Sequence, residues 1–156
     1  DEFPEIVVVG GSEVRLYEHW GERKWTMPLA PYGGGFGGPP TIADLDGDGV
    51  PEIGVAGANA YVTLRADGSV LWDASTRDRS SSVTGSTVFD FDGDGKAEVV
   101  YADEFAIRVF RGLDGVVLWE TLTPNGTVHE LPVVADVDGD GKAEIVRAAS
   151  TVYTSG

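Results

Sequence analysis

The sequence reads DLDGDGVPEI at residues 44–53, DFDGDGKAEV at 90–99 and DVDGDGKAEI at 136–145, so one acidic stretch occurs three times at a spacing of 46 residues. Three tryptophans, Trp25, Trp72 and Trp119, follow one another at a spacing of 47. A fourth, partial copy opens the chain, because DEFPEIVVVGG at 1–11 aligns with DGVPEIGVAGA at 48–58. A period of this length indicates a repeat architecture in which each copy is one supersecondary unit.

Each repeat predicts four short strands. A first apolar strand runs into the acidic loop, and a second, nearly all-apolar strand such as AEVVYAD follows, which is typical of a strand covered on both faces. The third strand alternates, with Arg15, Thr63 and Arg108 between apolar residues, so one of its faces is expected to meet water. Asp-Gly turns at 67–68 and 114–115 lead into a fourth strand that ends on the tryptophan.

Four antiparallel strands in a unit of this length are typical of a β-propeller blade. No segment shows the 3.6-residue periodicity of a helix, so the predicted class is all-β with essentially no helix. The predicted units are a partial blade at 1–29 (strands 2–4), blades at 39–73 and 85–120, and a partial blade at 131–156 (strands 1–3). The polar stretches between them are interpreted as inter-blade loops, with domain linkers as the alternative. The chain holds 156/46, or about 3.4, repeats, so we expect an incomplete propeller, cut from a longer chain or completed by another copy.

The acidic loops follow the pattern D-x-D-G-D-G-x-x-E, which places carboxylates at positions 1, 3, 5 and 9. Converging carboxylates repel one another unless a cation lies between them. The loops offer only hard oxygen ligands, without His or Cys, which disfavours zinc and copper and favours calcium. The residue at position 7 can contribute only its backbone carbonyl. An EF-hand is excluded because the Glu stands at position 9 rather than 12 and strands flank the loop. A solvated acidic turn without metal is the alternative.

The stretch GGPPTIADLDGDGVPEIGVAGA at 37–58 resembles the FG-GAP repeat of integrin α-subunit propellers and is similar to the related bacterial VCBS-type repeats. Glu at position 9, where integrin loops usually carry Asp, favours the bacterial type. In that family the loop joins the first two strands of a blade and binds calcium. The resemblance therefore implies three calcium ions and a fourth, partial site, in which Asp1, Phe3 and Glu5 match positions 5, 7 and 9. The ligands of the three complete sites would be Asp44, Asp46, Asp48, Val50 and Glu52; Asp90, Asp92, Asp94, Lys96 and Glu98; and Asp136, Asp138, Asp140, Lys142 and Glu144.

The charge balance excludes several classes of function. With 26 acidic and 11 basic side chains the net charge is -15, which argues against nucleic acid and against an anionic membrane surface as partners. The three loops account for twelve of the acidic residues, so most of the net charge is ligand charge. The chain has no Cys, no apolar run long enough to span a membrane, and no basic, apolar leader at its first residues.

Catalytic signatures are weak, so the chain is predicted not to be an enzyme. His19 and His129 share no motif, and Ser80–Ser82 is a loop rather than a nucleophile elbow. Asn125 begins a glycosylation sequon, which is informative only in a eukaryotic protein. A protein or glycan ligand is expected on the face opposite the calcium loops. That face would carry Tyr32, Phe36, Asn59, Arg77, Arg79, Glu104, Phe105 and His129.

The leading hypothesis is a calcium-binding, non-catalytic propeller segment that is secreted or displayed at the cell surface for adhesion or ligand binding. Extracellular calcium is near millimolar, so modest affinity would fill such loops there, whereas cytosolic calcium would leave them empty. One alternative is an accessory propeller of a secreted carbohydrate-active enzyme. Another is a structural subunit of a surface layer or filament.

Overall fold

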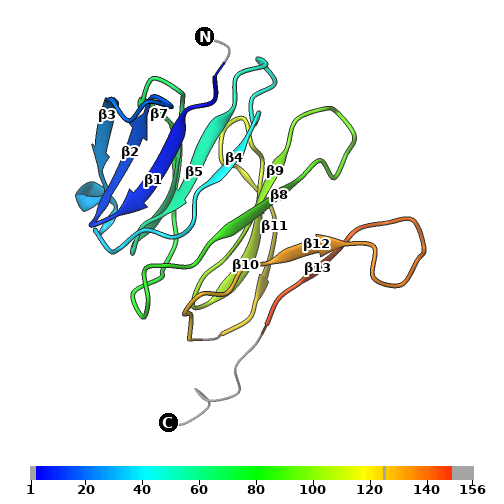
Figure 1. Cartoon of the computed structure of the whole chain (residues 1–156). Coiled ribbons are helices and arrows are strands. Elements are labelled where there is room, and N and C mark those ends of the chain that lie inside the picture. The colour runs from blue at the N-terminus through cyan, green and yellow to red at the C-terminus, as the bar shows by residue number, and fades with distance from the viewer. Residues whose placement is uncertain (1–2, 125, 149–156) are drawn as a thin grey trace.

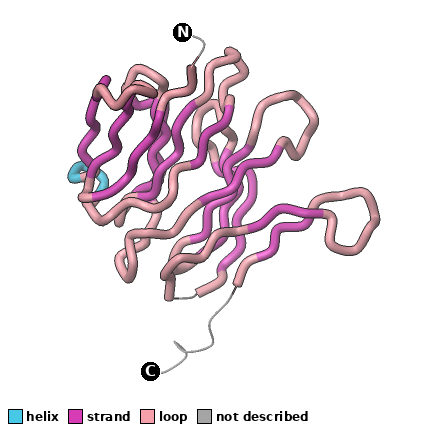
Figure 2. Tube along the Cα trace, in the orientation of Figure 1, coloured by secondary structure: helices cyan, strands magenta, loops and turns pink. Residues whose placement is uncertain are grey.

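The computed structural model describes residues 3–124 and 126–148, and it is built of β-strands, as predicted. Apart from one turn of 3-10 helix, η1, at Ala30–Tyr32, the described residues contain no helix (Figure 2). None of the helical structure in the described ranges could cross a membrane. The strands are β1 (Ile6–Gly10), β2 (Glu13–Tyr17), β3 (Arg23–Pro28), β4 (Thr41–Ala43), β5 (Glu52–Ala56), β6 (Ala60–Leu64), β7 (Val70–Ser75), β8 (Ser86–Phe89), β9 (Glu98–Ala102), β10 (Ala106–Phe110), β11 (Val117–Leu122), β12 (Val133–Ala135) and β13 (Glu144–Val146).

The strands form four separate antiparallel sheets, in which each strand pairs only with its neighbours in sequence (Figure 1). The sheets, called A to D here, contain β1–β3, β4–β7, β8–β11 and β12–β13. Their first strands lie close together, with β4 against β8 and β8 against β12. The acidic loops, which connect β4 to β5, β8 to β9 and β12 to β13, all project from the same side of the stack in Figure 1. The division into blades stays a prediction, and the third strand predicted for 131–156 falls in a part of the chain that extends beyond the described residues.

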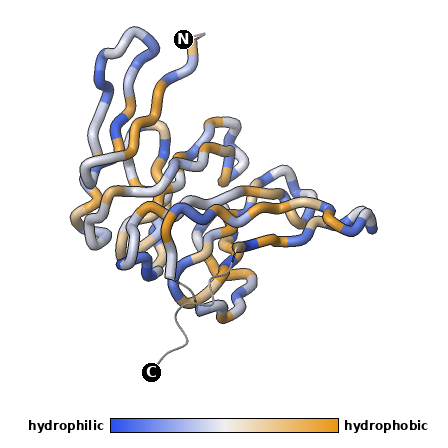
Figure 3. The backbone as a smooth tube through the Cα atoms, turned by 60° about the horizontal axis from the view of Figure 1, so that its bottom comes forward, coloured by the Kyte–Doolittle hydropathy of each residue, from blue (hydrophilic) through white to orange (hydrophobic). Residues whose placement is uncertain are grey.

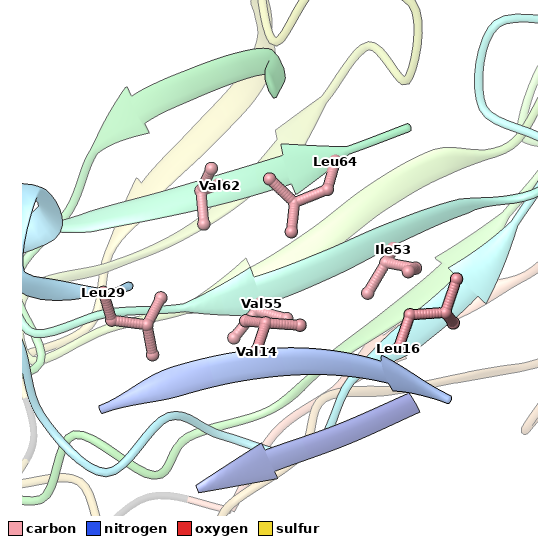
Figure 4. Close-up of a cluster of buried hydrophobic side chains, with 7 residues drawn as sticks. All are labelled: Val14, Leu16, Leu29, Ile53, Val55, Val62 and Leu64. Carbon is pink, nitrogen blue, oxygen red and sulfur yellow. The ribbon is translucent and has the colours of Figure 1, made fainter. Parts of the chain in front are cut away.

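Apolar side chains fill the space between successive sheets. Between sheets A and B, Val14 and Leu16 of β2 face Ile53 and Val55 of β5, and all four are nearly inaccessible to water (Figure 4). Because side chains alternate along a strand, the neighbouring residues of β5 point to the other face, where Ala56 belongs to the core between sheets B and C. Strands β5 and β9 are therefore buried on both faces, as their nearly all-apolar sequences predict.

The core between sheets B and C is rich in aromatic residues. Tyr61 lies 5.1 Å from Tyr101 and 5.8 Å from Trp72, measured between ring centroids. A smaller core between sheets C and D joins Val100 and Ile107 to residues of β12 and β13. The hydrophobic segments lie mainly along the strands and the hydrophilic ones mainly in the loops (Figure 3).

One expectation about the third strands is wrong for sheet B. Thr63 of β6 is fully buried rather than exposed, because sheet C covers its face. Arg15 and Arg108, at the corresponding places of β2 and β10, are partly accessible.

The repeating tryptophans link each sheet to the hairpin of the next. The Trp25 indole Nε1–H donates to the carbonyl of Ala66 at 2.9 Å, and that of Trp72 donates to the carbonyl of Gly112 at 2.6 Å. A Cβ on Gly68 or Gly115 would lie within 3.0 Å of the ring of Trp25 or Trp72, so the glycines allow this close approach. Trp25 and Trp72 therefore pack between successive repeats.

Candidate metal centre

The first aspartate of each acidic loop organises the loop through its own backbone. Asp44 accepts hydrogen bonds from the N–H groups of Gly47 at 2.7 Å and Gly49 at 3.0 Å. Both glycines have positive φ, +82° and +87°, a conformation that favours residues without a Cβ. The D-x-D-G-D-G sequence therefore folds back on its first carboxylate.

The other two loops repeat this arrangement. Asp90 accepts from Gly93 at 2.7 Å and Gly95 at 2.9 Å, and Asp136 accepts from Gly139 at 2.6 Å and Gly141 at 2.9 Å. The hydrogen bond from Gly95, with those from Gly93 and Asp94, outweighs the opposing effect of burial and lowers the pKa of Asp90. The geometry of this loop thus favours the charged form of Asp90, which is the form that binds a cation.

The glutamate at position 9 ties each loop to the second strand of its sheet. Glu52 accepts from the N–H of Leu45 at 2.8 Å, Glu98 from Phe91 at 2.9 Å, and Glu144 from Val137 at 2.9 Å. Glu52 and Glu98 are almost fully buried, and burial raises the pKa of both, assisted by the charges of loop aspartates. Each of these glutamates is therefore a buried carboxylate facing other carboxylates, an arrangement that a cation would stabilise.

The structure brings most of the predicted carboxylates together. Three clusters place one oxygen of each member within 4.8 Å of the others, and these are Asp44, Asp46 and Asp48; Asp90, Asp92 and Asp94; and Asp136, Asp138 and Glu144. Glu52 and Glu98 do not join the first and second clusters. Asp140 is absent from the third, and its carboxylate pairs with Lys142 Nζ at 3.2 Å. The carboxylate oxygens still have lone pairs beyond their hydrogen bonds, so the chemistry of the donor set suits a hard cation.

The residues at position 7 donate to the loop through their backbone N–H. Val50 donates to Asp48 at 2.7 Å, Lys96 to Asp94 at 2.8 Å and Lys142 to Asp140 at 2.9 Å. The contribution of their carbonyl oxygens to a metal stays a prediction. The side chain of Lys96 lies over Gly47, so the first and second loops are in contact.

The partial site at the start of the chain has a different arrangement. Asp1 lies outside the described residues. Glu5 accepts from Lys24 Nζ at 2.9 Å, and this hydrogen bond lowers its pKa. Among the described residues Glu5 joins none of the three carboxylate clusters.

The opposite end of the sheets carries the residues predicted to meet a ligand, and several of them contact one another. Arg77 pairs with Glu104 at 3.2 Å and lies over the ring of Phe105 at 4.8 Å. Arg79 donates to the side-chain oxygen of Asn59 at 2.8 Å. Phe36 is 71% exposed. His129 is also exposed, Tyr32 belongs to η1, and Asn125 of the sequon falls outside the described ranges.

Sequence reasoning missed two buried aspartates at this end. Asp78 accepts from the N–H of Thr84 at 3.1 Å and from the hydroxyls of Ser81 and Thr127. Asp103 accepts from Arg108 Nη1 at 2.6 Å and from the N–H of Arg77 at 2.9 Å. Neither belongs to a repeated motif, so no periodic signal identifies them.

Comparisons with known proteins agree with the acidic-loop pattern. Residues 90–146 match the family described as FG-GAP-like repeat, which confirms the resemblance over this part of the chain. The crystal structure of the biofilm matrix protein Bap1 of V. cholerae is similar, with a TM-score of 0.61 and 32% identity over 64% of this chain and 17% of that chain. A protein of unknown function from Bacteroides caccae shares the fold, with a TM-score of 0.50 and 12% identity over 85% of this chain and 46% of that chain.

The chain spans less than half the length of either structure. A comparison with curated protein sequences gives no match.

Proposed function

We propose that the chain is a calcium-binding, non-catalytic segment of an extracellular β-propeller that serves adhesion or ligand binding. The observation that carries this proposal is the threefold repetition of one loop, in which the same hydrogen bonds hold converging carboxylates at the same end of successive sheets. A solvated acidic turn has no need of the buried glutamates that complete the first two loops, Glu52 and Glu98.

Calcium fits these loops better than other common metals. All side-chain donors are carboxylates, and calcium accepts several oxygen ligands in a flexible geometry. In each loop the ion would be held by the carboxylates at positions 1, 3, 5 and 9 and the carbonyl at position 7. Three ions would reduce the formal charge from -15 to -9, counting two positive charges for each ion.

The arrangement of the sheets supports a propeller. The first strands of sheets B, C and D lie side by side, and successive sheets are stacked face to face. Blades arranged around a propeller axis have this geometry. Ile6 and Val8 of sheet A are 48% and 40% exposed, although they occupy the register of the buried Ile53 and Val55 of sheet B. Further blades, from the same chain or another, would cover this face and complete a ring.

The extracellular setting and the adhesive role follow from chemistry and from similarity. Loops of modest affinity are filled at extracellular calcium concentrations. Bap1, a biofilm matrix protein, has the same fold over 64% of this chain. In the described residues the two histidines lie apart in the fold, and His19 packs between Phe3 and Trp20, which supports a role without catalysis.

Thermal unfolding with and without calcium tests the proposal. Ions that bind only the folded chain stabilise it by about 2.7 kcal/mol per site at a concentration one hundred times Kd, so a chelator is expected to lower Tm by more than about 5 °C. Calcium added in excess should restore Tm, whereas the same concentration of magnesium should restore it only partly. A Tm indifferent to chelator would refute calcium binding.

A further inference from the structure

Sheet A departs from the repeat at Phe3 and at the adjacent His19 and Trp20, which the fold brings together. Phe3 stands where the other loops have Val50, Lys96 and Lys142. Trp20 stands at the hairpin position that is Asp67 in sheet B and Asp114 in sheet C. His19 replaces the preceding Ala66 and Leu113. These substitutions together convert a polar hairpin into an aromatic one.

The three rings form one cluster at the β2–β3 hairpin. The Phe3 and His19 ring centroids are 4.3 Å apart, and those of His19 and Trp20 are 4.6 Å apart with the rings nearly perpendicular. Phe3 and Trp20 are nevertheless 59% and 58% exposed. The hairpin lies beside the N-terminal segment at the upper left of Figure 3.

The turn of this hairpin has the same backbone form as those of sheets B and C. Gly21 has a φ of +93°, similar to Gly68 and Gly115 at the same position. Phe3 and Trp20 are exposed beside this turn, so the aromatic cluster is accessible from outside the stack.

Charged groups surround the cluster and connect it to a groove. Lys24 Nζ lies 2.9 Å from Glu5 and 3.2 Å from Glu18, and Trp20 Nε1–H donates to Glu22 at 3.2 Å. Glu5 and Lys24 also line a groove of about 500 Å³ between sheets A and B, whose floor includes Val7, Leu16 and Ile53. Aromatic rings, hydrogen-bonding groups and a groove of this volume are the usual parts of a small-molecule or oligosaccharide site.

We infer that the aromatic cluster of Phe3, His19 and Trp20, with Glu5, Glu18 and Lys24 beside it, binds a neutral glycan. The C–H face of a pyranose packs on an exposed indole, and its hydroxyls accept from an ammonium and donate to carboxylates. Two carboxylates, Glu5 and Glu18, pair with Lys24 in a chain of net charge -15, so an acidic polysaccharide would be repelled. This site lies at the acidic-loop end, includes Phe3 and Glu5 of the partial first loop, and contains no ligand of the three complete calcium loops, so it goes beyond the proposed function.

The experiment measures binding of neutral hexasaccharides of glucose, mannose and galactose to the calcium-loaded chain by isothermal titration calorimetry. At least one of them is expected to bind, and Trp20→Ala to raise its Kd at least about tenfold. Trp20→Phe should retain part of the affinity, because the aromatic face remains. Trp119→Ala is the matched control, since Trp119 is 47% exposed on sheet C, away from the cluster.

The outcomes separate this inference from the calcium proposal. Absence of binding to all three hexasaccharides, equal affinity of Trp20→Ala and the unmodified chain, or equal losses in Trp20→Ala and Trp119→Ala would each overturn the glycan site. Tighter binding of an alginate oligosaccharide than of the neutral ones would do the same. A Tm that still responds to chelator in those experiments would leave calcium binding intact. An unchanged Tm of Trp20→Ala verifies that the variant is folded.

Discussion

The two ends of the sheet stack are held together in different ways. At the acidic-loop end, hydrogen bonds join residues two to seven positions apart and recur almost unchanged in three loops. At the opposite end, Asp78 bonds to Thr127 across 49 positions and Arg77 to Asp103 across 26. Within the described parts of the other repeats, none of the bonds to Asp78 or Asp103 has a counterpart.

The difference separates metal binding from the connection of the sheets. Local bonds shape each loop by itself and can preform a cation site in every copy, but they do little to attach one sheet to the next. The bond of Asp78 to Thr127 joins two inter-sheet loops, and that of Asp103 to Arg77 joins the β9–β10 turn of sheet C to the loop that precedes this sheet. We therefore expect stability at the acidic-loop end to depend on calcium and stability at the opposite end to be independent of it.

The largest single effect is expected from Asp78→Ala. This substitution leaves Thr127, Ser81 and the N–H of Thr84 without their buried acceptor, which should cost about 2–4 kcal/mol of the free energy of unfolding. The loss, measured by urea denaturation, should be the same in calcium and in chelator. Asp73→Ala, at an exposed position of β7, is the control and should change stability by less than about 0.5 kcal/mol. A loss seen only in calcium would remove the distinction between the two ends.

The second effect concerns a single loop. Asp90→Ala removes the carboxylate that accepts from Gly93 and Gly95 and belongs to the second cluster. It should abolish about a third of the rise in Tm that calcium produces, because two loops remain. Calorimetric titration should then show two bound ions rather than three. Three ions bound with unchanged affinity would show that Asp90 is not a ligand.

The third effect, that of Glu98→Gln on Tm, is expected to have opposite signs in chelator and in calcium. Glu98→Gln keeps an oxygen that can accept from the N–H of Phe91. It removes a buried carboxyl group whose pKa is raised by burial and by nearby aspartates. In chelator Tm should rise by a few degrees, and in calcium the increment from this loop should fall. Melting scans of the variant in both conditions test this, and a lower Tm in chelator would contradict it.

The sequence predicts the acidic-loop end far better than the opposite end, for a physical reason. A loop whose contacts are local and repeated leaves a periodic signal, so the carboxylates at 44–52 and 90–98 could be assigned to sites before the structure was known. The bonds of Asp78 and Asp103 depend on which segments the fold brings together, and no spacing encodes that. Thr63 was misjudged for the same reason, because its burial comes from the neighbouring sheet. The pairing of Asp140 with Lys142 is local, but a lysine at the same position of the second loop lies over Gly47 instead.

The smallest expected effect is a shift in acid unfolding. Burial opposes the charge of Asp78, but hydrogen bonds from Thr127 and Thr84 prevail and hold its pKa below the ordinary value. A lowered pKa in the folded state contributes stability above the pKa of the unfolded chain, about 3.9, and that stability is lost as pH falls through the folded value.

Thr127→Val removes one donor at nearly constant volume, so the pKa of Asp78 should rise and the acid midpoint should move to higher pH by less than about one unit. Circular dichroism in chelator measures the midpoint, and the other carboxylates titrate alike in both proteins. Thr26→Val, exposed on β3, should leave the midpoint unchanged. An equal shift in the two variants, or none in Thr127→Val, would mean that the Thr127 hydroxyl does not stabilise the charge of Asp78.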